Sequence, residues 1–214
     1  MECGKQGDYL CKECLLHSKK QWPCCPNCQK LSPLGQTHDN CKTKLGLDGL
    51  ISVYCYGGVI KKAIFAVKYQ YAYKLSDNIA AIVGQDLNNL DLFSSPVLIP
   101  VPLYRKRENL RGFNQTEEIG KRLASRLNWG FEKDIVMRIK HSKPQVGLSH
   151  QQRLRNISGE FAVNMEYLAS IPELKSKTII VFDDVWTTGA TIKEVCKTLK
   201  ENGFKKVWGL TIAR

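Results

Sequence analysis

The sequence predicts an α/β protein: a parallel β-sheet with helices on both faces, preceded by a small cysteine-rich module. Short apolar runs alternate with segments of helical periodicity from Leu50 to the end of the chain, which is typical of a buried parallel sheet. Seven of the nine cysteines lie in the first 41 residues, where apolar periodicity is almost absent. We therefore expect two domains, residues 1–48 and residues 49–214.

Apolar periodicity predicts the first elements of the larger domain. Alternating β-branched and aromatic residues indicate a strand at 50–56. Helical spacing indicates helices at 59–67 and 75–90. A proline-bounded apolar run predicts a buried strand within 96–103, and the elements that follow are a helix over 113–127, a short strand over 134–138 and a long loop over 140–156.

The carboxyl-terminal part contains the clearest buried strand, 178–184. We expect a helix over 191–202 next, ended by Gly203 in the position that follows the helix cap. A strand over 206–214 closes the chain.

The chain has 214 residues and a formal net charge of +12, so its expected partners are anionic: phosphorylated sugars, nucleic acid or anionic lipid. No apolar run approaches the roughly 18–20 residues that cross a bilayer. The amino end is polar and lacks the apolar segment of a signal peptide. A cytoplasmic protein is the simplest expectation.

A candidate ligand site follows the strand over 178–184. The strand delivers two adjacent carboxylates, Asp183 and Asp184, to its carboxyl end, where open α/β sheets bind ligands. A small hydroxyl-rich turn then enters a helix, whose N–H groups and dipole favour an anion. The turn consists of Thr187, Thr188, Gly189, Ala190 and Thr191. Acids beside an anion cradle suit a ribose 5-phosphate; the alternative is that the acids and the turn only cap the helix.

Two basic segments are candidates for binding further phosphate groups, because arginine forks match phosphate oxygens. The first contains Arg105, Lys106, Arg107 and Arg111. The second contains five basic and no acidic residues, Arg138, Lys140, Lys143, Arg153 and Arg155. For the second, the alternative is an exposed cationic loop without a role in the site.

The amino-terminal cysteines predict a metal site before disulfides, because a cytoplasmic chain keeps its thiols reduced. Cys11-x2-Cys14 and Cys25-x2-Cys28 have the spacing at which two thiolates meet one tetrahedral zinc ion. Two such pairs can close one structural site, and the alternative is unliganded thiols in a disordered tail. Cys55 and Cys196 fit buried positions of the larger domain.

Three blocks of the sequence resemble the ComF/GntX-like family, competence-associated proteins with a type I phosphoribosyltransferase domain. The blocks are PVPL…R…RGFNQ at 100–115, KPQVGLS…QRLRNISGEF at 143–161 and VFDDVWTTGAT at 181–191. The resemblance implies a type I phosphoribosyltransferase fold with an amino-terminal double zinc ribbon. It also implies a ligand, phosphoribosyl pyrophosphate (PRPP), bound together with Mg²⁺.

The resemblance carries roles to individual residues. Asp183 and Asp184 would be catalytic and hold the ribose hydroxyls, and residues 187–191 would hold the 5-phosphate. The pyrophosphate would lie against Arg105, Arg107 and Arg111. Residues 143–161 would form a flexible lid in which Lys143, Arg153 and Arg155 neutralise the pyrophosphate.

The resemblance also suggests two sets of zinc ligands. One set would be Cys25, Cys28, His38 and Cys41, with His38 replacing the family cysteine that is missing at Lys44. The other would be Cys3, Cys11 and Cys14, completed by His17 or Cys24 unless this second site has degenerated.

Two functional hypotheses follow. The first is a Mg²⁺-dependent PRPP-binding protein that transfers a phosphoribosyl group to an unidentified acceptor, with Lys68 and Tyr69 as candidates for contacting that acceptor. The second is a single-stranded-DNA-handling protein of DNA uptake, in which the cations and aromatics of 68–74 bind the strand. For these aromatics, the alternative is that they cover the edge of the core. A partner in the competence machinery is implied by the resemblance alone.

Overall fold

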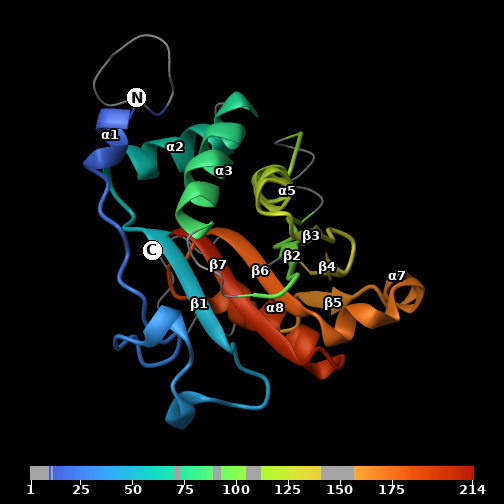
Figure 1. The fold of residues 1–214 in the computed structure, drawn as a ribbon. Coiled ribbons are helices and arrows are strands. Elements are labelled where there is room, and N and C mark those ends of the chain that lie inside the picture. The colour runs from blue at the N-terminus through green and yellow to red at the C-terminus, as the bar shows by residue number, and fades with distance from the viewer. Residues whose placement is uncertain (1–9, 11, 70–72, 89–92, 105–111, 141–156) are drawn as a thin grey trace.

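The computed structural model describes residues 10, 12–69, 73–88, 93–104, 112–140 and 157–214 of the chain. Within these residues the centre is a five-stranded parallel sheet with the strand order β1-β7-β6-β2-β3 (Figure 1). The strands are β1 (Gly49–Tyr54), β2 (Val97–Pro100), β3 (Gly130–Phe131), β6 (Thr178–Val185) and β7 (Lys206–Ala213). The predicted fold class is confirmed.

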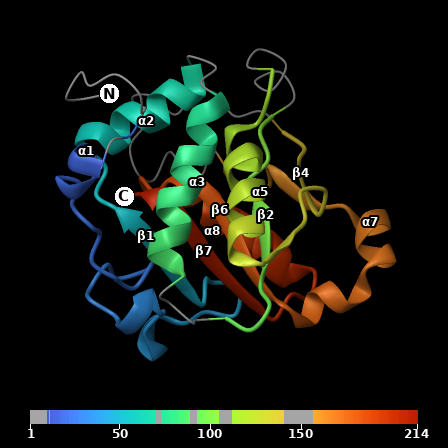
Figure 2. The same cartoon turned by 45° about the horizontal axis from the view of Figure 1, so that its top comes forward.

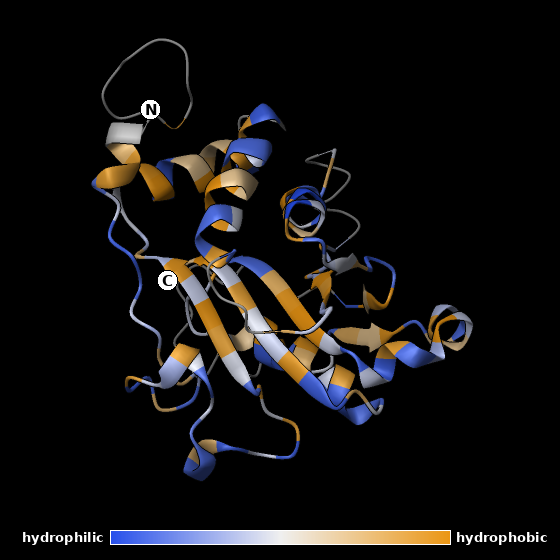
Figure 3. Ribbon diagram, viewed as in Figure 1, coloured by the Kyte–Doolittle hydropathy of each residue, from blue (hydrophilic) through white to orange (hydrophobic). Residues whose placement is uncertain are grey.

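Helices cover both faces of the sheet (Figure 2). The helices on one face are α2 (Gly58–Tyr69), α3 (Tyr73–Leu87) and α5 (Gln115–Leu127), and α8 (Ala190–Glu201) lies on the other. In β6, Ile180 and Phe182 belong to the core of the first face, whereas Ile179 and Val181 belong to the core of the second. A strand that is apolar on both sides needs cover on both sides, and Figure 3 shows apolar residues recurring along the central strands.

A two-stranded antiparallel ribbon, β4 (Val136–Arg138) and β5 (Phe161–Val163), accompanies the main sheet. Arg138 pairs with Phe161, and the N–H of Ile139 donates to the carbonyl oxygen of Glu160 at 2.7 Å. The ribbon therefore joins the two ends of the segment 139–160. Residues 141–156 of that segment, which hold most of the predicted loop, lie outside the described part of the chain.

The other predicted elements agree with the structure in type and place. The strand expected at 50–56 is β1, and the helix expected at 191–202 is α8, which is capped by Asn202 and followed by Gly203 at φ 91°. From residue 49 onward, the elements missing from the prediction are β3, β5, α7 (Met165–Ser170) and the 3-10 helix Pro172–Ser176. These elements have two to six residues, too few for a hydrophobic period to emerge.

The amino-terminal residues line the outer edge of β1. They include α1 (Lys12–Leu16) and the 3-10 turns Pro33–Gly35 and Asp39–Cys41. The N–H of Gln21 donates to Val53 O at 3.0 Å, and Gln36 forms an isolated bridge with Gly49. An exposed strand edge invites pairing with another chain, so this segment protects β1. The domain boundary at residue 48 stays a prediction.

None of the helices in the described residues is both long and apolar enough to span a bilayer.

Candidate functional site

The two acids of β6 lie at the carboxyl edge of the sheet. β6 continues through Asp183 and Asp184, and its partner β7 lies beside both of them. The side chain of Asp184 is buried, whereas Asp183 is partly exposed. Both sequence-predicted acids therefore stand at the edge where parallel sheets bind their ligands.

Asp184 is held by side chains from two helices. Nζ of Lys68, in the last turn of α2, lies 2.6 Å from Asp184 Oδ2. Nε2 of Gln115, the first residue of α5, donates to the same oxygen at 3.2 Å. Lys68, predicted as a candidate for acceptor contact, is thus part of the acid site.

Asp183 has a different environment. Its Oδ1 accepts the N–H of Asp184 at 2.8 Å. Burial raises the pKa of Asp183 to about 7, and the negative charge of Asp184 acts in the same direction, against the opposing effects of Lys68, the Asp184 N–H and Arg138. Near neutral pH this carboxyl group can therefore exchange a proton.

The turn after β6 takes the shape that the sequence predicts. Gly189 adopts φ 74° and precedes the first turn of α8. The N–H of Ala190 donates to Thr188 Oγ1 at 3.3 Å. Trp186 is buried beneath the turn, and a Cβ at position 189 would stand 2.1 Å from Cζ2 of its ring. Strand, acids, turn and helix amino end thus form one contiguous unit, and the amino end of a helix is a place where anions are favoured.

The predicted pyrophosphate loop follows β2 and leads into α5. Asn114 caps α5 by accepting the N–H of Thr116 at 3.1 Å. Its Nδ2 also donates to Val101 O at 3.2 Å, which ties the end of the loop to the strand that begins it. The cations Arg105, Lys106, Arg107 and Arg111 lie outside the described residues.

The predicted lid starts and ends at the β4–β5 ribbon. Arg138 binds Glu160 at the ribbon end through Nη2 at 2.6 Å and Nε at 3.0 Å; Glu160 is buried and Arg138 is largely buried. The guanidinium of Arg138 also lies 5.4 Å from the ring centroid of Phe161. Lys143, Arg153 and Arg155 lie outside the described residues, so the predicted role of the lid stays a prediction.

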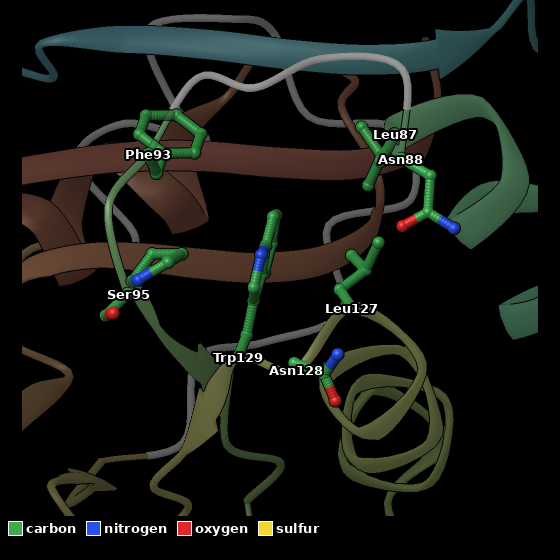
Figure 4. A pocket seen from close by; sticks show the side chains of 8 residues that line it. Leu87, Asn88, Phe93, Ser95, Leu127, Asn128 and Trp129 are labelled. Atoms are coloured by element: carbon green, nitrogen blue, oxygen red, sulfur yellow. The ribbon is translucent and has the colours of Figure 1, made fainter.

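Two hollows mark opposite edges of the sheet. A cavity of about 430 Å³ lies between the carboxyl end of β2, the start of α5 and β4, and its lining includes Pro100, Asn114 and Arg138. At the amino end of β2, a second pocket of about 260 Å³ is lined by Phe93, Trp129 and six other residues, none of them charged (Figure 4). Of these two, only the first is lined by charged side chains, both acidic and basic.

The amino-terminal segment contains a separate cluster of metal-binding side chains. The ligand atoms of Cys25, Cys28, His38 and Cys41 all lie within 4.8 Å of one another. Three sulfurs and one imidazole at tetrahedral spacing form a set compatible with structural zinc. This is the four-residue set that the family resemblance suggests.

The surroundings of the cluster also fit a metal site. Nε2 of His38 lies 3.0 Å from Leu31 O, the kind of outer contact that orients a ligating histidine. Burial opposes ionisation of Cys25, but the backbone groups of Cys28, His38 and Asn27 outweigh it and lower the pKa of Cys25 to about 6. The neighbouring thiol of Cys28, together with burial and Cys25, raises the pKa of Cys41 to about 11. Ionisation of one thiol thus opposes ionisation of the next, and a metal ion bound among them would favour the thiolate form of each.

The other cysteines that the structure describes do not join this cluster. Cys24 accepts a contact from Nη1 of Arg214, the last residue. Cys14 is buried in the core next to α2, and Cys3 and Cys11 lie outside the described residues, so the predicted second site stays a prediction. Cys196 is fully buried as expected, whereas Cys55 is only partly buried and contacts Lys20 O.

Comparison with known proteins identifies the family to which this fold belongs. The family model described as "Phosphoribosyl transferase domain" matches residues 117–213. Competence protein F of Haemophilus influenzae is 30% identical over 95% of this chain and 90% of its own length. The chain belongs to the ComF-like family of proteins with a phosphoribosyltransferase domain.

Other ComF-like relatives are more distant. Competence protein ComFC of Streptococcus pneumoniae is 26% identical over 89% of this chain and 80% of its own length. DNA utilization protein YhgH of Escherichia coli K12 is 23% identical over 94% of this chain and 89% of its own length. The similarity therefore includes the amino-terminal segment as well as the phosphoribosyltransferase domain.

Three residues near the candidate site make side-chain contacts that the sequence does not predict: Gln115, Arg138 and Glu160. Gln115 stands in the quoted RGFNQ block, but its bond to Asp184 joins residues 69 positions apart. Glu160 is a single acidic residue at the end of a cationic segment. That position is the one feature of the sequence that could have indicated its ion pair with Arg138.

Proposed function

We propose that the carboxyl edge of the sheet binds PRPP or a related ribose 5-phosphate. The observation that carries the proposal is the unit of β6, turn and α8: two carboxyl groups beside a glycine turn that opens a helix. The helix end suits the 5-phosphate, and the two acids suit vicinal ribose hydroxyls. The hydroxyl-rich residues Thr187, Thr188 and Thr191 supply further donors.

We also propose that the site supports phosphoribosyl transfer. The bond from C1 of the ribose to the pyrophosphate oxygen breaks, the electron pair leaves with pyrophosphate, and an acceptor lone pair forms the new bond at C1. Positive charge develops on the ribose in between, and the carboxylates of Asp183 and Asp184 stabilise it. The cations after β2 and in segment 143–155 bind the departing pyrophosphate in this scheme.

Mg²⁺ fits this proposal. The donors at the edge are carboxylate oxygens, the type that Mg²⁺ prefers, and Asp183 has one oxygen engaged only by a backbone N–H. When bound with PRPP, the ion would supply positive charge that neutralises the pyrophosphate.

Competition binding tests the proposal. PRPP bound in the presence of Mg²⁺ should be displaced by ribose 5-phosphate and by pyrophosphate, each of which reproduces half of the ligand, but not by unphosphorylated ribose. Displacement by pyrophosphate alone would contradict a ribose-phosphate site. A screen for pyrophosphate release over purine, pyrimidine and nicotinate-like acceptors then tests transfer.

For the cluster Cys25, Cys28, His38 and Cys41 we propose structural zinc. The short segment around it contributes few buried apolar side chains, and segments of that kind commonly require a metal to fold. The proposed role is to hold the amino-terminal segment against β1.

A second candidate function is the handling of single-stranded DNA. It is favoured by the names of the relatives, two competence proteins and a DNA utilization protein, and by the net charge of +12. Affinity for an oligonucleotide should then fall steeply with rising salt, because bound cations are released from the phosphates. Affinity that does not change with salt would contradict it. In this setting we propose a cytoplasmic location and a partner in the competence machinery.

A further inference from the structure

We infer that Lys68 is a positioning residue of the candidate ribose site: its ammonium group fixes Asp184 so that one carboxyl oxygen of each acid remains available to a ribose hydroxyl. The inference rests on the proposed function and assigns to α2 a part in the site. It differs from the sequence-based expectation that Lys68 contacts the acceptor.

In each of the two acids, one carboxyl oxygen makes all the contacts. Oδ2 of Asp184 receives both Lys68 Nζ and Gln115 Nε2, and Oδ1 of Asp183 receives the N–H of Asp184. Among the contacts of the described residues, the second oxygen of each acid has no hydrogen-bond partner. Two open oxygens at the edge of the sheet match the two vicinal hydroxyls of a ribose.

Burial explains why a cation is needed at this place. The side chain of Asp184 is 7% exposed and that of Lys68 is 23% exposed. A buried carboxylate without a countercharge is energetically costly. The ammonium group of Lys68 offsets that cost and fixes Oδ2 of Asp184, and Gln115 adds a second, uncharged restraint.

The test compares Lys68→Met with Lys68→Arg and with Lys61→Met, an exposed lysine of the same helix. Ribose 5-phosphate binding is measured at pH 7, with thermal melting as a check of folding. Lys68→Met should weaken binding by about tenfold or more, because Asp184 loses the charge-assisted hydrogen bond that positions it. Lys68→Arg should restore most of the affinity, and Lys61→Met should behave as wild type.

Rescue by Lys68→Arg separates positioning from folding, because a guanidinium group can hold the same carboxyl oxygen. Weaker binding by Lys68→Met at an unchanged melting temperature supports positioning. Wild-type affinity in Lys68→Met, or equally weak binding by Lys68→Met and Lys68→Arg, would overturn the inference. Failure of the proposed function is a different result, because the wild type itself would then bind no ribose 5-phosphate.

Discussion

Position 189 requires glycine for two independent reasons. Its φ of 74° is a conformation that side-chain-bearing residues avoid, and a Cβ would collide with the buried Trp186 ring at 2.1 Å. The turn is therefore specified by Trp186, which directly follows β6, as well as by its own sequence.

We expect Gly189→Ala to lower the free energy of unfolding by about 2–4 kcal/mol, from backbone strain plus the collision with Trp186. Two controls separate these causes. Gly112 has φ 73° with nothing within 4 Å of an added Cβ, so Gly112→Ala measures strain alone; Gly57→Ala meets open space without positive φ. Equal losses for Gly189→Ala and Gly112→Ala in chemical denaturation would contradict the collision.

Asp183 should make stability depend on pH. Its pKa is raised from 3.8 to about 7 in the folded protein, so between these values the folded state binds more protons than the unfolded state, and stability is lost as pH rises from about 4 to 7. Asp183→Asn removes this loss. Relative to wild type, the variant should gain of the order of 1–2 kcal/mol between pH 5 and pH 8. Parallel denaturation curves with no pH-dependent gain would contradict the raised pKa.

At the scale of elements, the β4–β5 ribbon depends on a buried ion pair. Arg138 and Glu160 close the two ends of segment 139–160, with side chains 10% and 2% exposed. Removing one partner of such a pair leaves an uncompensated buried charge.

We therefore expect Glu160→Gln to lower the free energy of unfolding by about 3 kcal/mol. Glu201→Gln is the matched control, because Glu201 and Lys197 form an exposed pair at 3.9 Å on α8. That control should change stability by less than about 0.5 kcal/mol. Similar effects of the two substitutions in urea denaturation would show that the Arg138 pair contributes no more than a surface pair.

The cysteine cluster gives a second prediction for an element. Cys28→Ser should lose one equivalent of zinc per chain relative to wild type, measured by elemental analysis of the purified protein, because it removes one of four ligands. Cys55→Ser keeps the cluster intact and should retain the wild-type content. Wild-type zinc content in Cys28→Ser would contradict the assigned ligand set.

The sequence predicts those features whose residues are neighbours along the chain. Strand β6, its acids, the glycine turn and α8 form one continuous segment, so apolar pattern and turn chemistry define them together. The pairing of Lys68 and Gln115 with Asp184 depends on the packing of α2 and α5 against the sheet. No local pattern contains that information. The proposed zinc ligands are predicted only in part: the cysteine spacing indicates a metal site, whereas His38 is suggested by the family resemblance alone.

At the scale of the whole molecule, Arg214 at the end of the sequence meets the segment around Cys24 beside β1. Arg214 donates its N–H to Tyr54 O at 3.0 Å and its guanidinium contacts Cys24. Near them Lys193, one turn into α8, lies 5.7 Å from the centroid of the Trp186 ring and experiences the charge of Cys25. Lys193 is therefore a common neighbour of the cysteine cluster and of the turn after β6, although the ligands proposed for these two places are different.

The central claim is that the acids at the end of β6 bind a ribose phosphate. Isothermal titration calorimetry with PRPP and Mg²⁺ tests it most directly, on the wild type and on the double variant Asp183→Asn, Asp184→Asn. The account predicts saturable binding by the wild type and at least about a hundredfold weaker binding by a folded double variant, since two charged hydrogen bonds are lost. No binding by the wild type, or equal binding by both proteins, would contradict it.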